Sequence, residues 1–259
     1  MPKLDLEHAL DVARRAVLAA SRVSLPYFER GVAVEMKPDD TPVTAADRAA
    51  EEAILATIRA DFPDHAFLAE ETGAHAGSAR TRWIVDPLDG TRGFARGGSF
   101  WGPLLALEHE GEVVIGACAL PVLGKHYWAA RGLGAYRDGT KLAVSRIATW
   151  KDATLSLGEL RRMLAMPEGR AVAELITTSA STRSFGDPAA PAMVLDGRAE
   201  CWLEAGVKTW DLAPFAVLLE EAGGQFTCWD GTRSIETGNA IGSNGLVHER
   251  VLSALYGVR

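Results

Sequence analysis

Cysteine and positive charge are both scarce in this sequence, and each deficit excludes a class of protein. Only three of the 259 residues are cysteines, Cys118, Cys201 and Cys228. Their wide spacing fits neither a zinc site nor a disulfide framework, so we expect a reducing, cytoplasmic environment. Lysine and arginine number 27 against 34 acidic residues, which gives a net charge of −7. Nucleic-acid binding relies on the opposite excess, so we expect no DNA or RNA partner.

Long hydrophobic runs and several common catalytic motifs are missing too. The longest apolar run, Val113 to Leu123, is about half the length of a membrane-spanning helix, so we expect no membrane partner. The six histidines show no HExxH spacing, and neither a GxSxG nor a GxxxxGK[ST] segment occurs. A zinc hydrolase of that type, a serine esterase and a P-loop kinase are therefore disfavoured.

The remaining composition is that of an ordinary globular protein, with 47% hydrophobic and 24% charged residues. Hairpin patterns dominate the first half, and short strands alternate with helices in the second. We predict a mixed α/β fold with two sheets, an N-terminal α+β lobe over residues 1–145 and a C-terminal α/β lobe over residues 146–259. In the second lobe, residues 175–178 favour a strand, and residues 212–222 favour a helix with Pro214 in its first turn.

The N-terminal third predicts two helices separated by a loop. Apolar residues at helical spacing predict a helix from Asp5 to about Val23, ended by Pro26. Residues 35–44 contain two prolines and four charged residues, which is typical of an exposed loop. Thr44 and Asp47 have the spacing of a capping box, with aspartate in place of glutamate, at the start of the next helix.

A pair of acids directly follows an apolar strand. Asp86 and Asp89 lie in the segment DPLDGT, immediately after the predicted strand Trp83 to Val85. A plain turn would also use Asp-Pro and Asp-Gly dipeptides. A buried strand has no need, however, to end in an acid with a second acid three residues later. Because a buried carboxylate is costly unless it is paired or binds a metal, we favour a metal site.

Two further acids occupy similar positions at element ends. Glu70 ends the preceding strand; with Glu71 it resembles a solvated surface pair, but adjacent strands would bring it beside Asp86. Asp211 opens a helix, where the commoner role is a cap or a first-turn acid. Together with Asp86 and Asp89 these acids form the oxygen-ligand set that Mg²⁺ prefers.

The residues after Asp89 suit an anion. Gly90 and Thr91 lie where a turn aims backbone N–H groups at a phosphate, and a helix starting there would complete the site. The Thr91 hydroxyl is also suited to orient a water molecule. Two metal ions about 3.5–4 Å apart activate such a water and stabilise the leaving alkoxide. The predicted chemistry is hydrolysis of a phosphate monoester.

Four segments resemble the inositol monophosphatase family of Mg²⁺-dependent phosphatases. LAEET, WIVDPLDGT and TWDLAPFAVLLEEAGG resemble its three signature segments, and EMKPDDTPVTAAD resembles its N-terminal loop. The resemblance covers nearly the whole chain. It implies a layered αβαβα sandwich of the inositol monophosphatase and fructose-1,6-bisphosphatase type, a homodimer, two or three Mg²⁺ ions per site, and a small phosphorylated substrate.

The resemblance also implies roles for individual residues. It places the metal ions on five groups: Glu70, Asp86, the Leu88 carbonyl, Asp89 and Asp211. Substrate would contact Asp89, Gly90, Thr91 and Asp211, with phosphate held at Gly90 and Thr91. The attacking water would be oriented by Glu70, Thr91 and Asp47, and Lys37 would lie on a mobile loop over the site. One departure from the family pattern is Ala69, where the family usually has glycine.

The substrate is indicated by residues 181–187, STRSFGD, which resemble the histidinol-phosphatase branch of the family. Gly93 and the stretch Ala119-Leu120-Pro121 depart from that branch. Histidinol phosphate carries an ammonium and an imidazole, so its pocket should contain acids.

Asp187 and Glu204 are the candidate acids of this pocket. Asp187 either contacts substrate or caps the helix that begins at Pro188. Glu204 does not distinguish histidinol phosphate from other substrates of the family, because the family also uses this position to bind a substrate hydroxyl. Arg183 would either contact phosphate or order Asp187 as a bidentate partner.

The sequence thus supports one leading hypothesis and two alternatives. The leading hypothesis is a Mg²⁺-dependent phosphatase that hydrolyses L-histidinol phosphate in histidine biosynthesis. The first alternative is a phosphatase for inositol 1-phosphate or another sugar or nucleotide monophosphate. The second is a noncatalytic phosphate-binding regulator, which would require the loss of a metal ligand or of the threonine; neither loss is seen.

Overall fold

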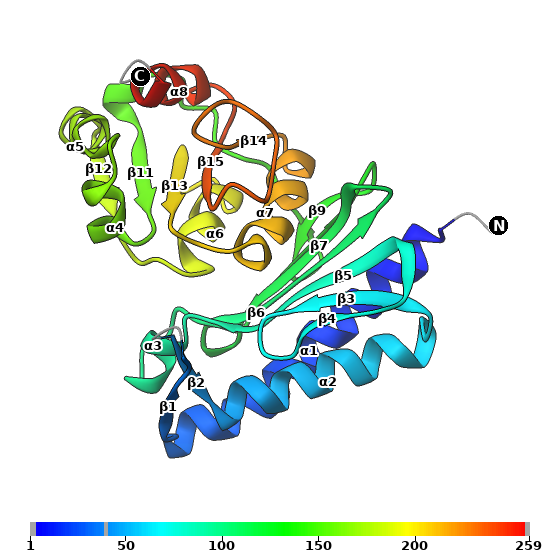
Figure 1. Ribbon diagram of the computed structural model, residues 1–259. Helices are drawn as coiled ribbons and strands as arrows, with labels where there is room; N and C mark the ends of the chain where they lie inside the picture. Colours follow the sequence, from blue (N-terminus) through cyan, green and yellow to red (C-terminus); the bar gives the residue numbers. More distant parts are fainter. Residues whose placement is uncertain (1–3, 39–40, 257–259) are drawn as a thin grey trace.

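Helices and sheets alternate in five layers in the computed structural model, which describes residues 4–38 and 41–256 (Figure 1). The first layer holds α1 (Leu6–Arg30) and α2 (Ala45–Asp61), and the third holds α6 (Ala189–Leu195) and α7 (Thr209–Glu221). The fifth layer holds α4 (Leu160–Ala165), α5 (Gly169–Thr178) and α8 (His248–Tyr256). The two sheets lie between these helical layers, which confirms the expected αβαβα sandwich.

The larger sheet has eight strands in the order β10-β9-β8-β7-β6-β5-β3-β4. Neighbours are antiparallel except for β3 and β5, which run parallel. Its strands are β3 (His65–Ala69), β4 (Gly73–His75), β5 (Ser78–Asp89), β6 (Gly102–His109), β7 (Glu112–Leu120), β8 (Lys125–Ala130), β9 (Gly134–Arg137) and β10 (Thr140–Lys141).

The smaller sheet has five strands in the order β12-β11-β13-β15-β14, and β11 is parallel to both of its neighbours. These strands are β11 (Thr154–Leu157), β12 (Ser181–Arg183), β13 (Cys201–Ala205), β14 (Gln225–Thr227) and β15 (Asn239–Ser243). A hairpin of β1 (Val34–Met36) and β2 (Pro42–Thr44), the short helix α3 (Thr91–Ala95) and two 3₁₀ turns (Pro121–Leu123 and Trp150–Asp152) complete the described elements.

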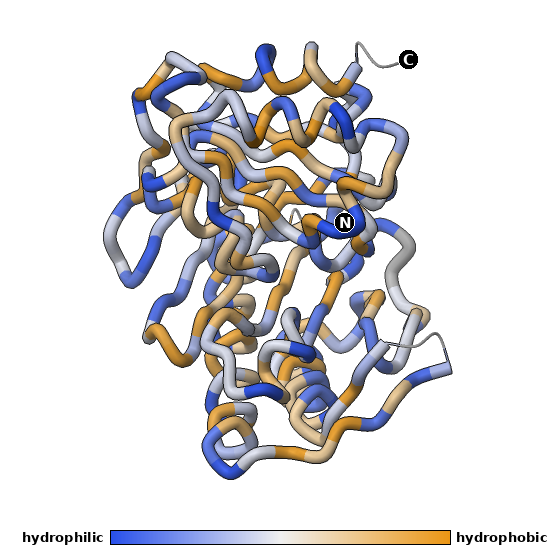
Figure 2. Tube along the Cα trace, turned by 90° about the vertical axis from the view of Figure 1, so that its left-hand side faces the viewer, coloured by the Kyte–Doolittle hydropathy of each residue, from blue (hydrophilic) through white to orange (hydrophobic). Residues whose placement is uncertain are grey.

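The three largest apolar cores of the described residues lie between the layers and hold them together. One lies between α1, α2 and the larger sheet, one surrounds α6 and α7 between the two sheets, and one lies between the smaller sheet and the outer helices. Figure 2 shows hydrophobic residues recurring along the strands of both sheets. Burying these residues supplies the main driving force for stacking the layers. Within the described residues, no helix combines the length and apolar character needed to cross a membrane.

The N-terminal predictions were partly wrong. Helix α1 does not end at Pro26 but continues to Arg30. Proline removes one hydrogen bond, but Leu25, Tyr27 and Phe28 pack beside the apolar cluster around Trp101, which favours continuing the helix. The predicted loop 35–44 forms part of the β1–β2 hairpin; positions 39 and 40 lie outside the described residues.

Two predictions in the C-terminal half were also wrong. Residues 175–178, expected as a strand because they include Ile176 and threonines, form the last turn of α5. Their helix is favoured because Ala171, Val172 and Leu175 lie on one buried face. Pro214 lies in the second turn of α7 rather than the first, because that helix begins earlier, at Thr209.

Candidate active site

Two parallel strand ends bring Glu70 and Asp86 to the same edge of the larger sheet. Ala69 of β3 lies opposite Val85 of β5. The Glu70 amide donates to the Val85 carbonyl at 3.1 Å, which continues the pairing one residue beyond β3. The next residue on each strand is an acid, and the two strands therefore deliver both acids to one place, as the sequence predicts.

The turn after Asp86 folds back on that acid. Oδ1 of Asp86 accepts the Leu88 amide at 2.9 Å, and the pairing of β5 with β6 is irregular between Asp86 and Asp89. Gly90 has φ +89°, a conformation that favours glycine, and precedes helix α3 at Thr91. The expected helix start after Gly90 is therefore present.

Asp211 approaches the same point from helix α7. Its Oδ2 accepts the Lys208 amide at 2.7 Å, which makes it a first-turn acid of a capping box. Asp86, Asp89 and Asp211 also each offer a carboxylate oxygen within 4.8 Å of the others. The structure thus combines both roles that the sequence left open for Asp211, a capping acid and a member of the acidic cluster.

Burial and mutual repulsion raise the pKa values of this cluster. Burial, followed by the charges of Glu70, Asp89 and Asp211, raises the pKa of Asp86 well above its ordinary value. Burial also raises the pKa of Asp89 well above its ordinary value and that of Asp211 to about 6. Carboxylates gathered in this way are stabilised by protons or cations. The all-oxygen donor set, without thiolate or imidazole, fits Mg²⁺.

Thr91 and Asp47 form a hydrogen-bonded pair beside the cluster. The Thr91 hydroxyl lies 2.9 Å from Asp47 Oδ1 and 3.1 Å from the Leu88 carbonyl. Asp47 Oδ2 accepts the Thr44 amide and hydroxyl at 2.8 and 2.6 Å, so the predicted capping box is confirmed. Burial raises the pKa of Asp47, although these hydrogen bonds oppose the shift.

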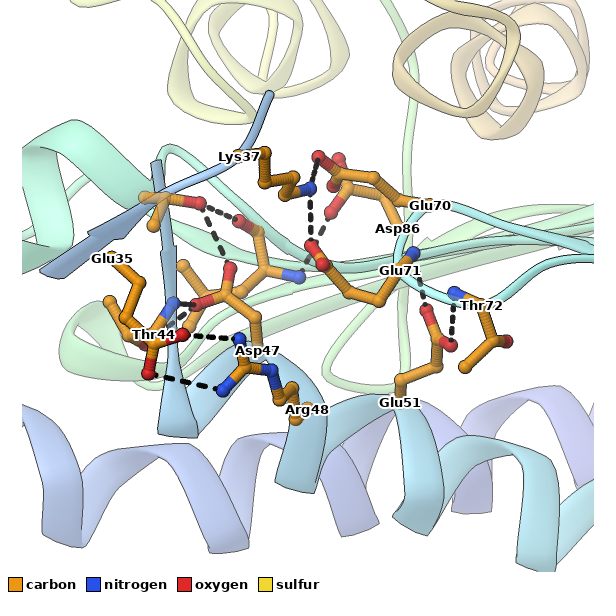
Figure 3. Close-up of polar contacts among 12 residues, drawn as sticks. Glu35, Lys37, Thr44, Asp47, Arg48, Glu51, Glu70, Glu71, Thr72 and Asp86 are labelled. Atoms are coloured by element: carbon orange, nitrogen blue, oxygen red, sulfur yellow. Dashed lines mark hydrogen bonds and ion pairs between the residues drawn. The ribbon is translucent and has the colours of Figure 1, made fainter. Parts of the chain in front are cut away.

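Lys37 reaches the site from the β1–β2 hairpin (Figure 3). Its Nζ donates to Oε1 of Glu70 at 2.9 Å and to Oε1 of Glu71 at 2.7 Å. Burial lowers the pKa of Lys37, but the hydrogen bonds to Glu71 and Glu70 outweigh burial and raise it. Burial likewise raises the pKa of Glu71 to about 7, against the effect of Lys37. Glu70 is thus paired with a lysine.

A cavity of about 490 Å³ opens over the acidic cluster, and Asp187 and Glu204 line it. Oδ2 of Asp187 lies so close to Gly90 that a Cβ there would approach it to 2.9 Å. Within residues 4–38 and 41–256, the Asp187 carboxylate has no hydrogen-bond or ion-pair partner. Helix α6 has no side-chain cap, so the alternative role of Asp187 as a helix cap is wrong.

Glu204 is a buried acid at another part of the cavity wall. Its Oε1 accepts the amides of Glu159 and Ala205 at 3.2 and 3.1 Å. Burial raises the pKa of Glu204 to about 7. The pKa of Asp187 is also about 7, because burial adds to the nearby charges of Asp211 and Glu159.

Arg183 is not brought together with the other candidate residues. The residue is exposed, its Nη1 donates to the neighbouring Thr182 carbonyl at 2.7 Å, and it does not line the cavity. Its guanidinium therefore does not order Asp187 in this structure. Two residues near the site were missed by the sequence reasoning, Glu51 and Glu159, and Glu71, interpreted as part of a solvated surface pair, instead forms an ion pair with Lys37. The spacing of Asp47 and Glu51, four residues apart on one helix, is a signal that could have found Glu51.

The layered sheets bring clustered carboxylates and the turn at Gly90 to one cavity, an arrangement that is suited to a phosphoric monoester hydrolase. The family model described as "Inositol monophosphatase family" matches residues 5–258, and the chain belongs to that family. The protein is accordingly a phosphoric monoester hydrolase, and members of its family act on small phosphorylated substrates and are Mg²⁺-dependent in general.

Known relatives cover nearly the whole chain. A histidinol-phosphatase of Chlorobaculum parvum is 37% identical over 97% of this chain and 96% of its own length. A histidinol-phosphatase of Mycobacterium tuberculosis is also 37% identical, over 97% of both chains. The solved inositol monophosphatase of Anabaena superposes with a TM-score of 0.86 at 32% identity, covering 99% of this chain and 98% of that one.

Proposed function

We propose that this protein hydrolyses L-histidinol phosphate to L-histidinol and inorganic phosphate, as a Mg²⁺-dependent step of histidine biosynthesis in the cytoplasm. The observation that supports this substrate is the Asp187 carboxylate, which lies against Gly90 of the proposed phosphate turn and has no side-chain partner among the described residues. An acid beside a phosphate repels it unless a positive charge offsets it, and Asp187 is not among the residues proposed to hold Mg²⁺, so we assign that charge to the substrate. Histidinol phosphate brings it, because its ammonium lies on the carbon next to the phosphorylated CH₂ group.

Five groups would hold two or three Mg²⁺ ions: the carboxylates of Glu70, Asp86, Asp89 and Asp211, and the Leu88 carbonyl. Bound Mg²⁺ supplies electrostatic stabilisation of the negative charge on phosphate and lowers the pKa of a bound water. The raised pKa values of Asp86 and Asp89 support this assignment, since a divalent cation replaces the protons that these buried acids otherwise retain.

Thr91, Asp47 and Glu70 would orient the attacking water. The Thr91 hydroxyl proton is directed at Asp47 Oδ1 or the Leu88 carbonyl, which leaves its oxygen lone pairs free to accept a hydrogen bond from water. The water oxygen would form a bond to phosphorus as the bond from phosphorus to the ester oxygen breaks, while the water gives up a proton and the departing histidinol oxygen gains one. The backbone N–H groups of Gly90 and Thr91 would bind the phosphate oxygens, and Lys37 would close one side of the site.

Asp187 would bind the substrate ammonium, and Glu204 would accept a hydrogen bond from the imidazole. Both carboxyls have a pKa of about 7, so a cationic substrate would favour their charged forms at neutral pH. The two histidinol-phosphatases at 37% identity support this substrate. The similarity to an inositol monophosphatase at 32% identity supports the runner-up, inositol 1-phosphate or another sugar or nucleotide monophosphate.

We also propose a homodimer, as the family resemblance implies. Phe100 and Phe185 are exposed by 36% and 43%, with their ring centroids 4.8 Å apart. Phe185 also lines the cavity over the acidic cluster, so the support for a dimer is the family resemblance and not this aromatic pair.

The direct test is steady-state phosphate release from a panel of substrates. The panel contains histidinol phosphate, inositol 1-phosphate, fructose 1,6-bisphosphate and an adenosine bisphosphate. We expect kcat/KM for histidinol phosphate to exceed the others by more than tenfold, and activity to be lost in EDTA. A preference below tenfold would contradict the substrate assignment, and no Mg²⁺-dependent release from any ester would favour the noncatalytic regulator.

A further inference from the structure

The turn that carries Glu70 is fixed by hydrogen bonds from its backbone amides to strand β5 and helix α2. Residues 70–72 connect β3 to β4 and present three consecutive backbone N–H groups. The Glu70 amide donates to the Val85 carbonyl of β5. The Glu71 and Thr72 amides donate to Oε2 and Oε1 of Glu51 at 2.9 and 3.0 Å (Figure 3). One strand and one helix thus fix the backbone from which Glu70 projects.

Glu51 is suited to this contact as a carboxylate. It lies on the buried face of α2 and is only 2% exposed. Its two oxygens each accept one of two successive N–H groups, which a glutamine could not do because its NH₂ group is a donor. A buried carboxylate is unfavourable unless it is hydrogen-bonded. The fold therefore keeps the Glu51 carboxylate buried, despite the free-energy cost, with both of its oxygens bonded to this one turn.

Helix α2 also contacts a second turn of the site, through the side chain of Asp47. Asp47 lies four residues before Glu51, which is about 6 Å along a helix axis. Its Oδ1 accepts the hydroxyl of Thr91, which belongs to the turn after β5. The two buried acids of one rigid helix therefore contact the two turns that carry Glu70 and Thr91, the residues proposed to orient water.

We propose that Glu51 is a positioning residue that sets the place of Glu70 relative to Thr91 and thereby the affinity of the site for divalent cations. Glu51 acts through the backbone of residues 71 and 72 and does not touch substrate. The inference rests on the proposed metal role of Glu70, but it is independent of which phosphate ester is hydrolysed. Loss of such a supporting contact typically costs about 10–100-fold in metal affinity or activity.

The test compares Glu51→Gln with Glu52→Gln, a matched control. Glu52 is the next residue on α2, is exposed, and undergoes the same change in charge. Mn²⁺ binding to the full-length, substrate-free protein is measured by isothermal titration calorimetry. We expect Glu51→Gln to weaken Mn²⁺ binding by about tenfold, and Glu52→Gln to bind like the wild type. Hydrogen–deuterium exchange should accelerate at residues 71 and 72 in Glu51→Gln alone.

A purely structural role for Glu51 predicts a different result. It would lower the melting temperature in EDTA but leave the Mn²⁺ affinity of the folded protein unchanged, and that outcome would overturn the proposal. If Glu51→Gln does not fold, Glu51→Asp keeps the charge but withdraws the carboxylate by one methylene, and wild-type affinity in that folded variant would equally overturn it. A wild-type protein that binds no Mn²⁺ would instead reject the metal site itself.

Discussion

The ammonium of Lys37 lies 2.9 Å from Oε1 of Glu70, so a lysine occupies one of the carboxylates proposed to bind metal. Both side chains are mostly shielded from solvent, at 18% and 19% exposure, where an ion pair is stronger than at an open surface. A cation binding at Glu70 must compete with this contact. Lys37 therefore supplies part of the positive charge that offsets Glu70.

Removing this competing charge should strengthen metal binding. We expect Lys37→Gln to raise the Mg²⁺ affinity of the substrate-free protein by about threefold to tenfold, since tenfold corresponds to about 1.4 kcal/mol. Isothermal titration calorimetry measures the change. Lys151→Gln, an exposed lysine whose replacement alters the net charge equally, is the control. Weaker Mg²⁺ binding in Lys37→Gln than in the control would show that Lys37 does not compete with the metal.

Asp89→Asn should lower the phosphatase activity while raising the stability of the fold. We expect the variant to lose nearly all phosphatase activity, because asparagine is a weaker, neutral metal ligand. In EDTA at pH 8 its melting temperature should rise by about 2–4 °C, or roughly 1 kcal/mol for a chain of this size, since asparagine has no ionised form to be disfavoured among the other buried acids. Differential scanning calorimetry and phosphate release check both effects. Retention of a tenth of the wild-type turnover would reject the role of Asp89 at the metal site.

The stabilising effect of Asp89→Asn in EDTA should depend on pH. Burial raises the pKa of Asp89 above its unfolded value, so the folded protein retains a proton that the unfolded chain releases. The contribution of Asp89 to the free energy of unfolding is therefore greatest below about pH 4, which is its pKa in the unfolded chain. This contribution is lost as the pH rises through the pKa of Asp89 in the folded protein. The melting temperature of the variant should exceed that of the wild type by more at pH 8 than at pH 5. An equal or opposite difference would contradict the raised pKa.

Asp187→Asn should change substrate preference rather than chemistry. We expect KM for histidinol phosphate to rise by about tenfold, as loss of a charge-assisted hydrogen bond of roughly 1.5 kcal/mol implies. The same substitution should leave hydrolysis of inositol 1-phosphate unchanged or improve it, because repulsion beside the phosphate turn falls. Steady-state kinetics of the variant and of the wild type with each of the two esters measure this change. An equal loss for both substrates would place Asp187 in a general structural role.

Gly158 should tolerate no side chain while Glu204 is in place. A Cβ at position 158 would lie 1.8–2.0 Å from the Glu204 carboxylate. We expect Gly158→Ala to destabilise the fold by about 1–3 kcal/mol, the usual effect of overpacking, and to weaken histidinol phosphate binding. Adding Glu204→Ala should recover most of the stability but not the binding. Urea denaturation of the single and double variants tests this coupling, and additive losses would contradict it.

The strand-end acids were predictable because their signal is local. An apolar strand that ends in an acid is visible in the sequence at Glu70 and at Asp86, and adjacent strands place such ends together. The capping box of Thr44 and Asp47 was predictable for the same reason. Convergence of Asp211 on this edge depends on how helix α7 packs between two sheets, which no local pattern encodes. The sequence offered only the position of Asp211 at the start of a helix, and the resemblance to a family supported its place in the ligand set.

The features that sequence reasoning missed depend on tertiary contacts. Pro26 is a strong helix terminator locally, but packing beside Trp101 outweighs the lost hydrogen bond. The side chains of residues 175–178 favour a strand, yet the buried face of α5 makes them helical. Glu51 resembles any solvated helical acid, because the two amides that it binds lie 20 and 21 residues later in the chain.

The most direct test of the central claim is a crystal structure of the wild-type protein grown with Mn²⁺ and recorded at the manganese absorption edge. The account predicts anomalous density between Asp86, Asp89 and Asp211, within about 2.2 Å of their carboxylate oxygens, with Glu70 released from Lys37 to join them. Saturating Mn²⁺ that leaves no anomalous peak among these acids, with the Lys37–Glu70 pair intact, would contradict it.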